Sequence, residues 1–299
     1  MRETDRNERL IGAFWVLLSA AGFGTGPIFA RIAYADGVDT PTLMFLRFSI
    51  AGAVMALLLW RLGDPWPRQG DLPVLLLMGT CGYVGQSLCY FSALHYASAG
   101  LTALLLYLYP AIVCVIVAVT TRRALERPRL WALVAALIGT ALTVSDSLQG
   151  SLLGIALGIG AALIYSIYIV VGEHLLKTVS AMGMAAVASL TAAAVYGGAI
   201  VWRGPAWPAS GAGWGAAAAI AFFSTILGVL GLFAGLKRLG AVDASTLSAV
   251  EPILTIVLAA AFLKEFIRPR QFLGGLLILA AVIFLIRYGT PRYKDVPAP

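Results

Sequence analysis

The chain of 299 residues is 60% hydrophobic and only 12% charged, with a mean hydropathy of +0.90 and a net charge of +7. A soluble domain carries about 25% charged residues because water must solvate its surface, so this composition excludes a water-soluble globule and indicates a lipid environment. The positive charges flank apolar stretches, which favours a role in membrane orientation over nucleic-acid binding.

Apolar stretches of membrane-spanning length follow one another along the chain. A helix of about 20 residues crosses the hydrocarbon core of a bilayer, so the sequence predicts an all-α membrane protein with ten transmembrane helices. The expected spans are residues 10–31, 42–61, 72–94, 99–120, 129–146, 151–172, 180–202, 212–237, 242–263 and 270–288. Prolines stand at three expected helix starts, where the missing N–H costs least: Pro73, Pro128 and Pro269. Tryptophans near the span ends suit an interfacial aromatic belt: Trp60, Trp66, Trp131, Trp202, Trp207 and Trp214.

Basic residues are distributed unevenly between the two sides of the membrane. The N-terminus, the C-terminus and the connections after the second, fourth, sixth and eighth spans hold 15 Lys and Arg residues, and the opposite connections hold five. Basic residues favour the cytoplasmic side, so we expect both termini in the cytoplasm. The cluster between Lys264 and Arg270 runs against this rule, and orientation alone does not explain it.

The second half of the chain repeats the first at an offset of 142 residues, which relates Pro110 in the fourth span to Pro252 in the ninth. The same offset pairs Gly12 with Gly154, Trp60 with Trp202 and Phe91 with Phe233. We therefore expect two five-helix repeats, residues 1–149 and 150–299. Because five is odd, the second repeat must enter the membrane inverted, which is an architecture of secondary transporters. A duplicated structural protein or a passive channel is the alternative.

The prolines of the fourth and ninth spans predict two broken helices. A proline inside a helix removes one hydrogen bond and displaces the carbonyl group four residues earlier, which belongs to Leu106 for Pro110 and to Ser248 for Pro252. Such acceptors are tolerated at membrane depth only inside protein or beside a water-filled cavity. The pair therefore predicts hinges at Pro110 and Pro252 beside a central site, and a packed kink is the alternative.

Two ionisable side chains lie unusually deep. Glu251 is the only acidic residue far inside a span, and Arg47 is the most enclosed basic one. Charges at this depth are costly and either pair with each other or serve a function. Glu251 is thus expected to bind substrate or a transported proton, or else to be protonated or structurally paired.

Polar aromatic residues mark one face of the third span. Tyr83, Gln86 and Tyr90 follow one another at steps of three and four, which places them on one side of a helix. Tyr107 in the fourth span and Tyr165 in the sixth add further hydroxyl groups. This face is expected to line a cavity or to form a packing seam between helices.

Small residues and cysteines are expected to serve packing. Three glycine pairs at a spacing of four predict close helix contacts: Gly22 and Gly26, Gly154 and Gly158, and Gly231 and Gly235. The three cysteines have no metal-ligand spacing and are expected to be buried thiols: Cys81, Cys89 and Cys114. The sequence has no serine-hydrolase elbow, zinc-protease motif or Walker loop, so no enzyme, cofactor or nucleotide-driven pump is expected.

Together these features resemble the drug/metabolite transporter superfamily, EamA type. The resemblance covers residues 10–288 and is carried by the ten spans in two inverted halves, Arg47, Pro110, Glu251-Pro252 and Lys264-Glu265. In the stretch Gly82–His95 the chain is most similar to bacterial exporters of the YddG type, which lie in the inner membrane and export aromatic and other neutral amino acids. The resemblance implies a central cavity lined by spans one, three, four, six, eight and nine.

The chain departs from this family pattern at the end of the fourth span. The acidic residue that is common there should fall near Arg123, and the nearest acidic residue is Glu126. The first span also lacks the glutamate that four-helix members of the superfamily use for proton exchange, which leaves Glu251 as the deep candidate for coupling.

The sequence therefore predicts an inner-membrane exporter of amino acids or related metabolites that works by alternating access. The ammonium group of a zwitterion is expected to meet the carbonyls of Leu106 and Ser248 and the carboxylate of Glu251. Its carboxylate is expected to meet Tyr83, Gln86 and Tyr90, and its side chain an apolar wall of Trp15, Phe23 and Tyr107. A drug, nucleobase or nucleotide-sugar carrier and a non-transporting scaffold are the alternatives, and the oligomeric state is open, a monomer included.

Overall fold

The computed structural model describes residues 3–93, 95–97, 99–122, 126–143, 150–263 and 268–288. In chain order, its helical segments are α1 (Glu3–Ala35), α2 (Thr40–Leu62), α3 (Leu72–Leu77), η1 (Met78–Val84), α4 (Gly85–Ala93), α5 (Ala99–Leu106), α6 (Tyr109–Thr121), α7 (Arg127–Thr143), α8 (Leu152–Leu175), α9 (Ala181–Arg203), α10 (Gly211–Ala219), η2 (Ile220–Leu227), α11 (Gly228–Leu239), α12 (Ala241–Leu247), η3 (Ser248–Val250), α13 (Glu251–Leu263) and α14 (Pro269–Tyr288). The described residues form no β-strand, only an isolated bridge between Ala97 and Gly150.

These segments make ten rods that lie on the ten predicted spans. Four rods are composite: α3–η1–α4, α5–α6, α10–η2–α11 and α12–η3–α13. Within the described residues, nine rods are long and apolar enough to cross a membrane, and α7, the tenth, has 17 described residues. The all-α prediction is confirmed. The stretch 264–267, which includes the expected Lys264-Glu265 pair, and Arg123 lie outside the described residues.

Local chemistry explains why the helices begin and end where they do. Ser151, Ser180 and Ser210 cap the N-termini of α8, α9 and α10, each accepting a hydrogen bond from a backbone N–H of the first turn. Gly63 ends α2 in the left-handed conformation that glycine adopts without strain. Pro73, Pro128 and Pro269 occupy the first or second position of their helices, as predicted.

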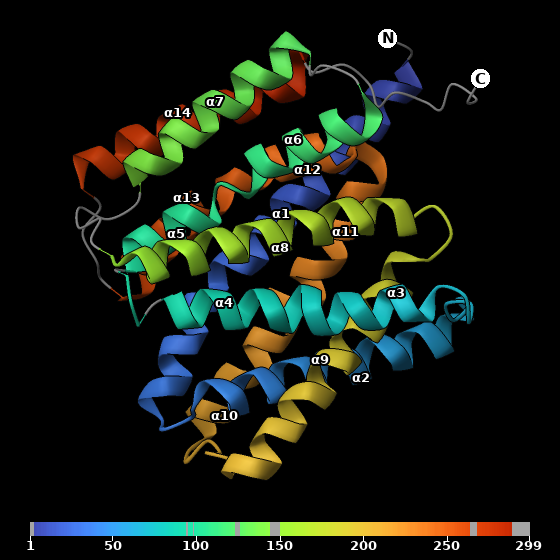
Figure 1. The fold of residues 1–299 in the computed structure, drawn as a ribbon, viewed down its shortest axis with the longest axis vertical. Coiled ribbons are helices and arrows are strands. Elements are labelled where there is room, and N and C mark those ends of the chain that lie inside the picture. The colour runs from blue at the N-terminus through green and yellow to red at the C-terminus, as the bar shows by residue number, and fades with distance from the viewer. Residues whose placement is uncertain are drawn as a thin grey trace.

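Helices of the first half pack against helices of the second half, in pairs that the sequence repeat relates to one another (Figure 1). The rod of α2 packs along α9, and α7 packs along α14, so the second span meets the seventh and the fifth meets the tenth. The repeat relates α1 to α8 and α4 to α11. The packed pair α1–α11 therefore corresponds to the packed pair α4–α8. Each of these pairs joins one half of the chain to the other, so the halves share one core.

The repeat extends to the irregular parts of the backbone. Two π-helical segments, η1 and η2, begin at Met78 and Ile220, which are related by the 142-residue offset. The two breaks are related in the same way: α5 gives way to α6 just before Pro110, and η3 precedes Pro252. Each proline is the second residue of a new helix, where its missing N–H is not needed. The predicted breaks are present, and they lie just before the prolines.

Glycines allow α1 and α11 to approach closely. A Cβ atom on Gly231 would lie 2.9 Å from the backbone oxygen of Trp15. Ser19 Oγ on α1 donates a hydrogen bond to the backbone oxygen of Gly228 at 2.6 Å. The close contact predicted from the Gly231 and Gly235 pair is therefore confirmed.

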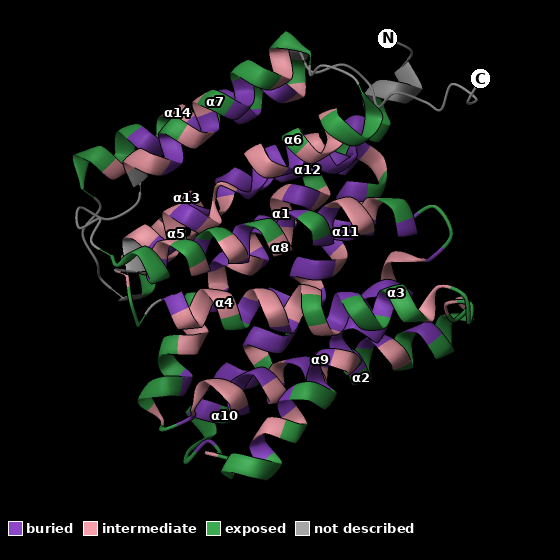
Figure 2. Ribbon diagram, viewed as in Figure 1, coloured by how far each residue is buried: buried purple, intermediate pink, exposed green. Residues whose placement is uncertain are grey.

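Exposed residues lie along the outside of the bundle (Figure 2), and many of them are large and apolar. All six tryptophans predicted for the interfacial belt are exposed, with Trp202 reaching 90%. The cysteines are free thiols, but only Cys114 is buried. Cys81 is exposed on η1, contrary to the expectation of burial, and a thiol is apolar enough to face lipid.

Candidate functional site

Two adjoining cavities lie where the halves meet. The smaller cavity has a volume of about 160 Å³ and the larger one about 400 Å³. They share six lining residues, namely Arg47, Gln86, Ser87, Leu106, Tyr107 and Glu251. Because the shared residues are mostly polar, the two cavities form one polar region inside an apolar bundle.

The spans that line this region include the six implied by the family resemblance. Phe23 and Pro27 come from the first span, Gln86 from the third, and Tyr165 from the sixth. The eighth span contributes Val229 and Leu232, while the fourth and ninth contribute Tyr107 and Glu251. The second span also takes part, through Arg47 and Met44.

A chain of aromatic rings forms one wall of the smaller cavity. The ring of Tyr83 lies edge-on to those of Phe48 and Tyr168, with centroids 4.9 and 5.6 Å apart. Tyr165 continues the chain to Tyr109, whose ring centroid is 4.8 Å away. Rings packed on one another in this way are rigid, and their hydroxyl groups add polar points to an apolar surface.

One hydroxyl group in this wall has no hydrogen-bond partner. Tyr168 is buried and lines the smaller cavity, and its phenol oxygen makes no hydrogen bond within the described part of the chain. Most buried polar atoms are satisfied by protein or water. The Tyr168 hydroxyl is therefore a buried, unsatisfied donor beside the cavity.

Arg47 is held in place by residues around its guanidinium group. Its Nε donates a hydrogen bond to Thr225 Oγ1 on η2 at 2.6 Å. The guanidinium carbon lies 5.1 Å from the ring centroid of Phe48, within the range of a cation–π interaction. The phenol of Tyr83 also interacts with this group. The side chain is thus fixed where it borders both cavities.

Glu251 owes its position to the break in the ninth span. The 3₁₀ turn of η3 ends at Val250, so Glu251 is the first residue of α13 and lies at the positive end of its dipole. Its carboxylate has no hydrogen-bond or ion-pair partner within 4 Å among the described residues. Glu251 borders both cavities.

The structure brings eight of the ten predicted site residues to the cavities: Phe23, Tyr83, Gln86, Tyr90, Leu106, Tyr107, Tyr165 and Glu251. Trp15 and Ser248 do not line them. Trp15 lies two turns of α1 before Phe23, with its ring against Phe14. The backbone carbonyl of Ser248 accepts a hydrogen bond from the N–H of Glu251, so the 3₁₀ turn already satisfies the acceptor that was predicted to be free.

Sequence reasoning left five polar lining residues out of the site, namely Arg47, Ser87, Tyr109, Tyr168 and Thr255. Arg47 was recognised as deep without a role, and Tyr168 as a hydroxyl one turn from Tyr165. Tyr109 directly precedes Pro110, and this position at the predicted helix break could have identified it as a site residue. Ser87 carried no signal, because a single serine is ordinary in a membrane helix.

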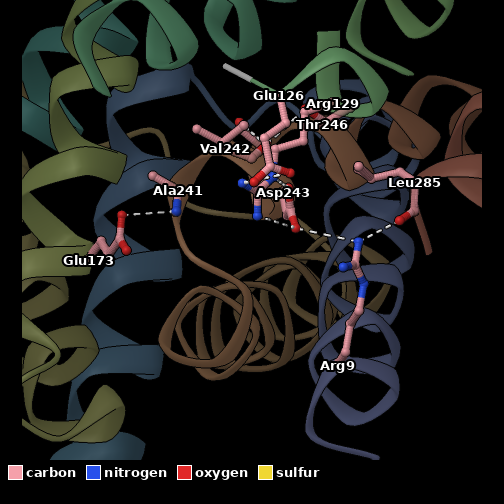
Figure 3. A network of polar contacts seen from close by, with 10 residues as sticks. Arg9, Glu126, Arg129, Glu173, Ala241, Val242, Asp243, Thr246 and Leu285 are labelled. Atoms are coloured by element: carbon pink, nitrogen blue, oxygen red, sulfur yellow. Dashed lines mark hydrogen bonds and ion pairs between the residues drawn. The ribbon is translucent and has the colours of Figure 1, made fainter. Parts of the chain in front are cut away.

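A buried charged cluster lies near the end of the bundle at which α1 begins, and Figure 3 shows its contacts. Asp243 on α12 is only 2% exposed, and its Oδ1 lies 2.8 Å from Arg129 Nε on α7. Arg9 on α1 lies 3.5 Å from the other carboxylate oxygen and also donates a hydrogen bond to the backbone oxygen of Leu285 on α14. The cluster therefore ties two helices of each half together.

Further polar contacts lie at both ends of the bundle, one within the second half and one between the halves. Near the charged cluster, the backbone N–H of Ala241 donates to Glu173 on α8 at 2.9 Å (Figure 3). At the opposite end, Ser210 donates its N–H and Oγ to the carboxylate of Asp36, at 2.9 and 2.7 Å. These hydrogen bonds lower the pKa of Asp36. Both ends thus carry polar contacts, but only the first has a buried ion cluster among the described residues.

Comparison with known proteins agrees with this architecture. The sequence model of the EamA-like transporter family matches the chain twice, over residues 10–145 and 152–287. The uncharacterized transporter YcbK of Bacillus subtilis (strain 168) is 26% identical over 282 residues, which cover 89% of this chain and 90% of the relative. An uncharacterized transporter of Archaeoglobus fulgidus is 24% identical over 284 residues, covering 91% and 98%.

A solved structure, described only as a crystal structure of a protein, shares the fold. Its TM-score is 0.78 at 23% sequence identity, and the match covers 93% of this chain and 96% of that chain. The two family matches fall on the two halves that the structure interleaves. This protein belongs to the EamA-like transporter family.

Proposed function

We propose that this transporter exports amino acids, aromatic and other neutral ones, or closely related metabolites across the bacterial inner membrane, with both termini in the cytoplasm. The observation that carries the proposal is the composition of the central cavities. One carboxylate, one guanidinium and a wall of tyrosine rings border the same space. An aromatic amino acid presents the matching groups: an ammonium, a carboxylate and a flat apolar side chain.

The charge content of the cavities argues against larger anionic cargo. Arg47 is the one cation in the two described linings. A nucleotide sugar carries a diphosphate, and recognition of phosphates usually draws on several cationic or backbone donors. The larger cavity of about 400 Å³ also lies within the usual size range for small-molecule sites.

Alternating access is supported by two features of the rods that line the cavities. The fourth and ninth spans break before Pro110 and Pro252, which we propose as hinges. The third and eighth spans each contain a π-helical segment, a local irregularity that often occurs at functional sites. Two related sets of irregular helices around one site suit a carrier whose halves exchange roles.

Transport by purified protein in liposomes tests the proposal. Radiolabelled phenylalanine should enter at a rate that saturates with concentration and that unlabelled phenylalanine reduces. Liposomes without protein control for leakage. Flux that rises linearly without competition, or no flux of any neutral amino acid, would contradict the proposed cargo.

A further inference from the structure

Two opposite charges border one cavity without neutralising each other. Arg47 comes from α2 in the first half of the chain and Glu251 from α13 in the second, and both line the smaller and the larger cavity. They nevertheless form no ion pair within 4 Å, and neither has another ion-pair partner within that distance in the described part of the chain.

This arrangement is costly unless another molecule completes it. An uncompensated charge inside a membrane protein is expensive, so structural charges normally pair directly. The chain makes such pairs elsewhere: Asp243 contacts Arg129 at 2.8 Å in the buried cluster. Arg47 and Glu251 differ from that cluster because both border the cavities and do not contact each other.

The surroundings of Arg47 leave part of its guanidinium group to a ligand. Thr225 already occupies Nε, Phe48 packs on the plane of the group, and the Tyr83 phenol interacts with a further donor. The donors that remain are on the terminal nitrogens, whose planar fork matches the two oxygens of a carboxylate. Glu251 offers only acceptors when ionised, which suits an ammonium group.

We propose that Arg47 binds the carboxylate of the substrate and Glu251 its ammonium group, so that this pair makes the cavity selective for zwitterions. The assignment rests on the proposed transport of amino acids and deepens it. In this assignment Arg47, and not Tyr83, Gln86 or Tyr90, is the main group that binds the substrate carboxylate. The tyrosine wall then receives the side chain, and the Tyr168 hydroxyl remains as a further donor.

Three probes of similar shape test the two proposed contacts one at a time. Phenylalanine carries both charged groups, phenethylamine lacks the carboxylate, and 3-phenylpropionate lacks the ammonium group. Each analogue leaves one of the two protein charges unpaired. Wild-type protein in nanodiscs should therefore bind phenylalanine about ten- to a hundredfold more tightly than either analogue. Isothermal titration calorimetry measures all three affinities on one preparation.

Variants assign each charge to its partner. Arg47→Gln should weaken phenylalanine and 3-phenylpropionate by about tenfold or more and leave phenethylamine nearly unchanged. Glu251→Gln should weaken phenylalanine and phenethylamine and spare 3-phenylpropionate. Arg61→Gln, on the same helix as Arg47 but exposed at its end, is the matched control and should change none of them.

Folding is checked independently by size-exclusion profile and thermal unfolding. Arg47→Lys keeps the positive charge and serves if Arg47→Gln does not fold: it should retain the preference for a carboxylate with a weaker affinity, because lysine lacks the planar fork. Equal losses for all three probes in both charge variants would overturn the assignment while leaving amino-acid transport in place. Wild-type protein that binds none of the probes would overturn the assignment and the proposed function together.

Discussion

At the scale of single residues, the site depends on side chains that a helix presents on one face. Tyr83, Gln86 and Tyr90 were predicted to share a face, and the structure places all three at the cavities. The face is split between them: Tyr83 borders the smaller cavity, Tyr90 the larger one, and Gln86 both. The tyrosines are therefore expected to contact different parts of a substrate.

Tyr83→Ala and Tyr90→Ala should change the preference between phenylalanine and threonine. Loss of one contact made only to the aromatic substrate is expected to cost about 1–2 kcal/mol, or roughly ten- to thirtyfold in affinity. Competition assays with both amino acids measure the ratio. Tyr83→Phe keeps the ring and is the matched control for packing against Phe48 and Tyr168. An unaltered ratio in both alanine variants would remove these rings from substrate recognition.

Trp15 and Ser248, which do not line the two described cavities, show what single residues cannot reveal. The direction of the Trp15 side chain depends on how α1 is rotated against its neighbours, and Ser248 depends on a 3₁₀ hydrogen bond to Glu251. Arg47 could be recognised as deep from the sequence. Its neighbours Thr225 and Phe48 follow only from the meeting of α2 with η2, a contact between residues far apart in the chain.

At the scale of elements, the sequence was most informative where local chemistry decides the outcome. Apolar length predicted the ten rods, and proline predicted the two breaks because it cannot continue a hydrogen-bonded helix. The π-helical segments η1 and η2 had no recognised signal. Glycine and other small residues are common throughout this chain, and the close approach of neighbouring helices that accompanies these segments is a tertiary effect.

Pro110→Ala and Pro252→Ala should reduce the maximal rate of transport several-fold with little change in substrate affinity. Alanine restores a backbone donor and favours a continuous helix through each break, which stiffens the proposed hinges. Initial transport rates and binding isotherms separate the two quantities. Pro73→Ala is the control, because Pro73 stands at the regular start of α3 and does not follow a helix break inside a span. Unchanged rates in both hinge variants would argue that the breaks are static.

The charged cluster around Asp243 gives a prediction about the stability of the fold. Asp243→Asn removes the buried carboxylate that contacts both Arg9 and Arg129, so it should destabilise the protein by about 3–5 kcal/mol. The exposed pair of Glu8 and Arg238, 3.3 Å apart at the same end, is the comparison: Glu8→Gln should cost less than about 1 kcal/mol. Denaturant-unfolding curves in detergent measure both. Equal small effects in the two variants would show that the cluster contributes little to the stability of the protein.

At the scale of the whole molecule, the shared core explains why the fold was more predictable than the site. Each half supplies rods that pair with the other half, so the repeat in the sequence already implied a symmetric partner for each span. The buried cluster around Asp243 breaks that symmetry, because the residues at the equivalent positions are Leu101, Ser151 and Gln271. This difference between the two ends follows from particular residues and not from the repeat.

The orientation of the bundle can be tested directly. In a cysteine-free background, Gln69→Cys in the connection after α2 should resist an impermeant thiol reagent added outside intact cells, because the excess of basic residues places this side in the cytoplasm. Ala209→Cys in the connection before α10 should react. Both positions are exposed, so accessibility differs only by side. The reverse pattern would invert the proposed orientation.

The central claim is that this protein carries an amino acid by alternating access, and counterflow tests it most directly. Liposomes loaded with unlabelled phenylalanine and diluted into a trace of labelled phenylalanine should accumulate label transiently above its external concentration. A carrier produces this overshoot because the internal substrate drives the return of its binding site. We predict an overshoot that disappears in Glu251→Gln. Label that only equilibrates, without an overshoot in the wild-type protein, would indicate a passive pathway and contradict the account.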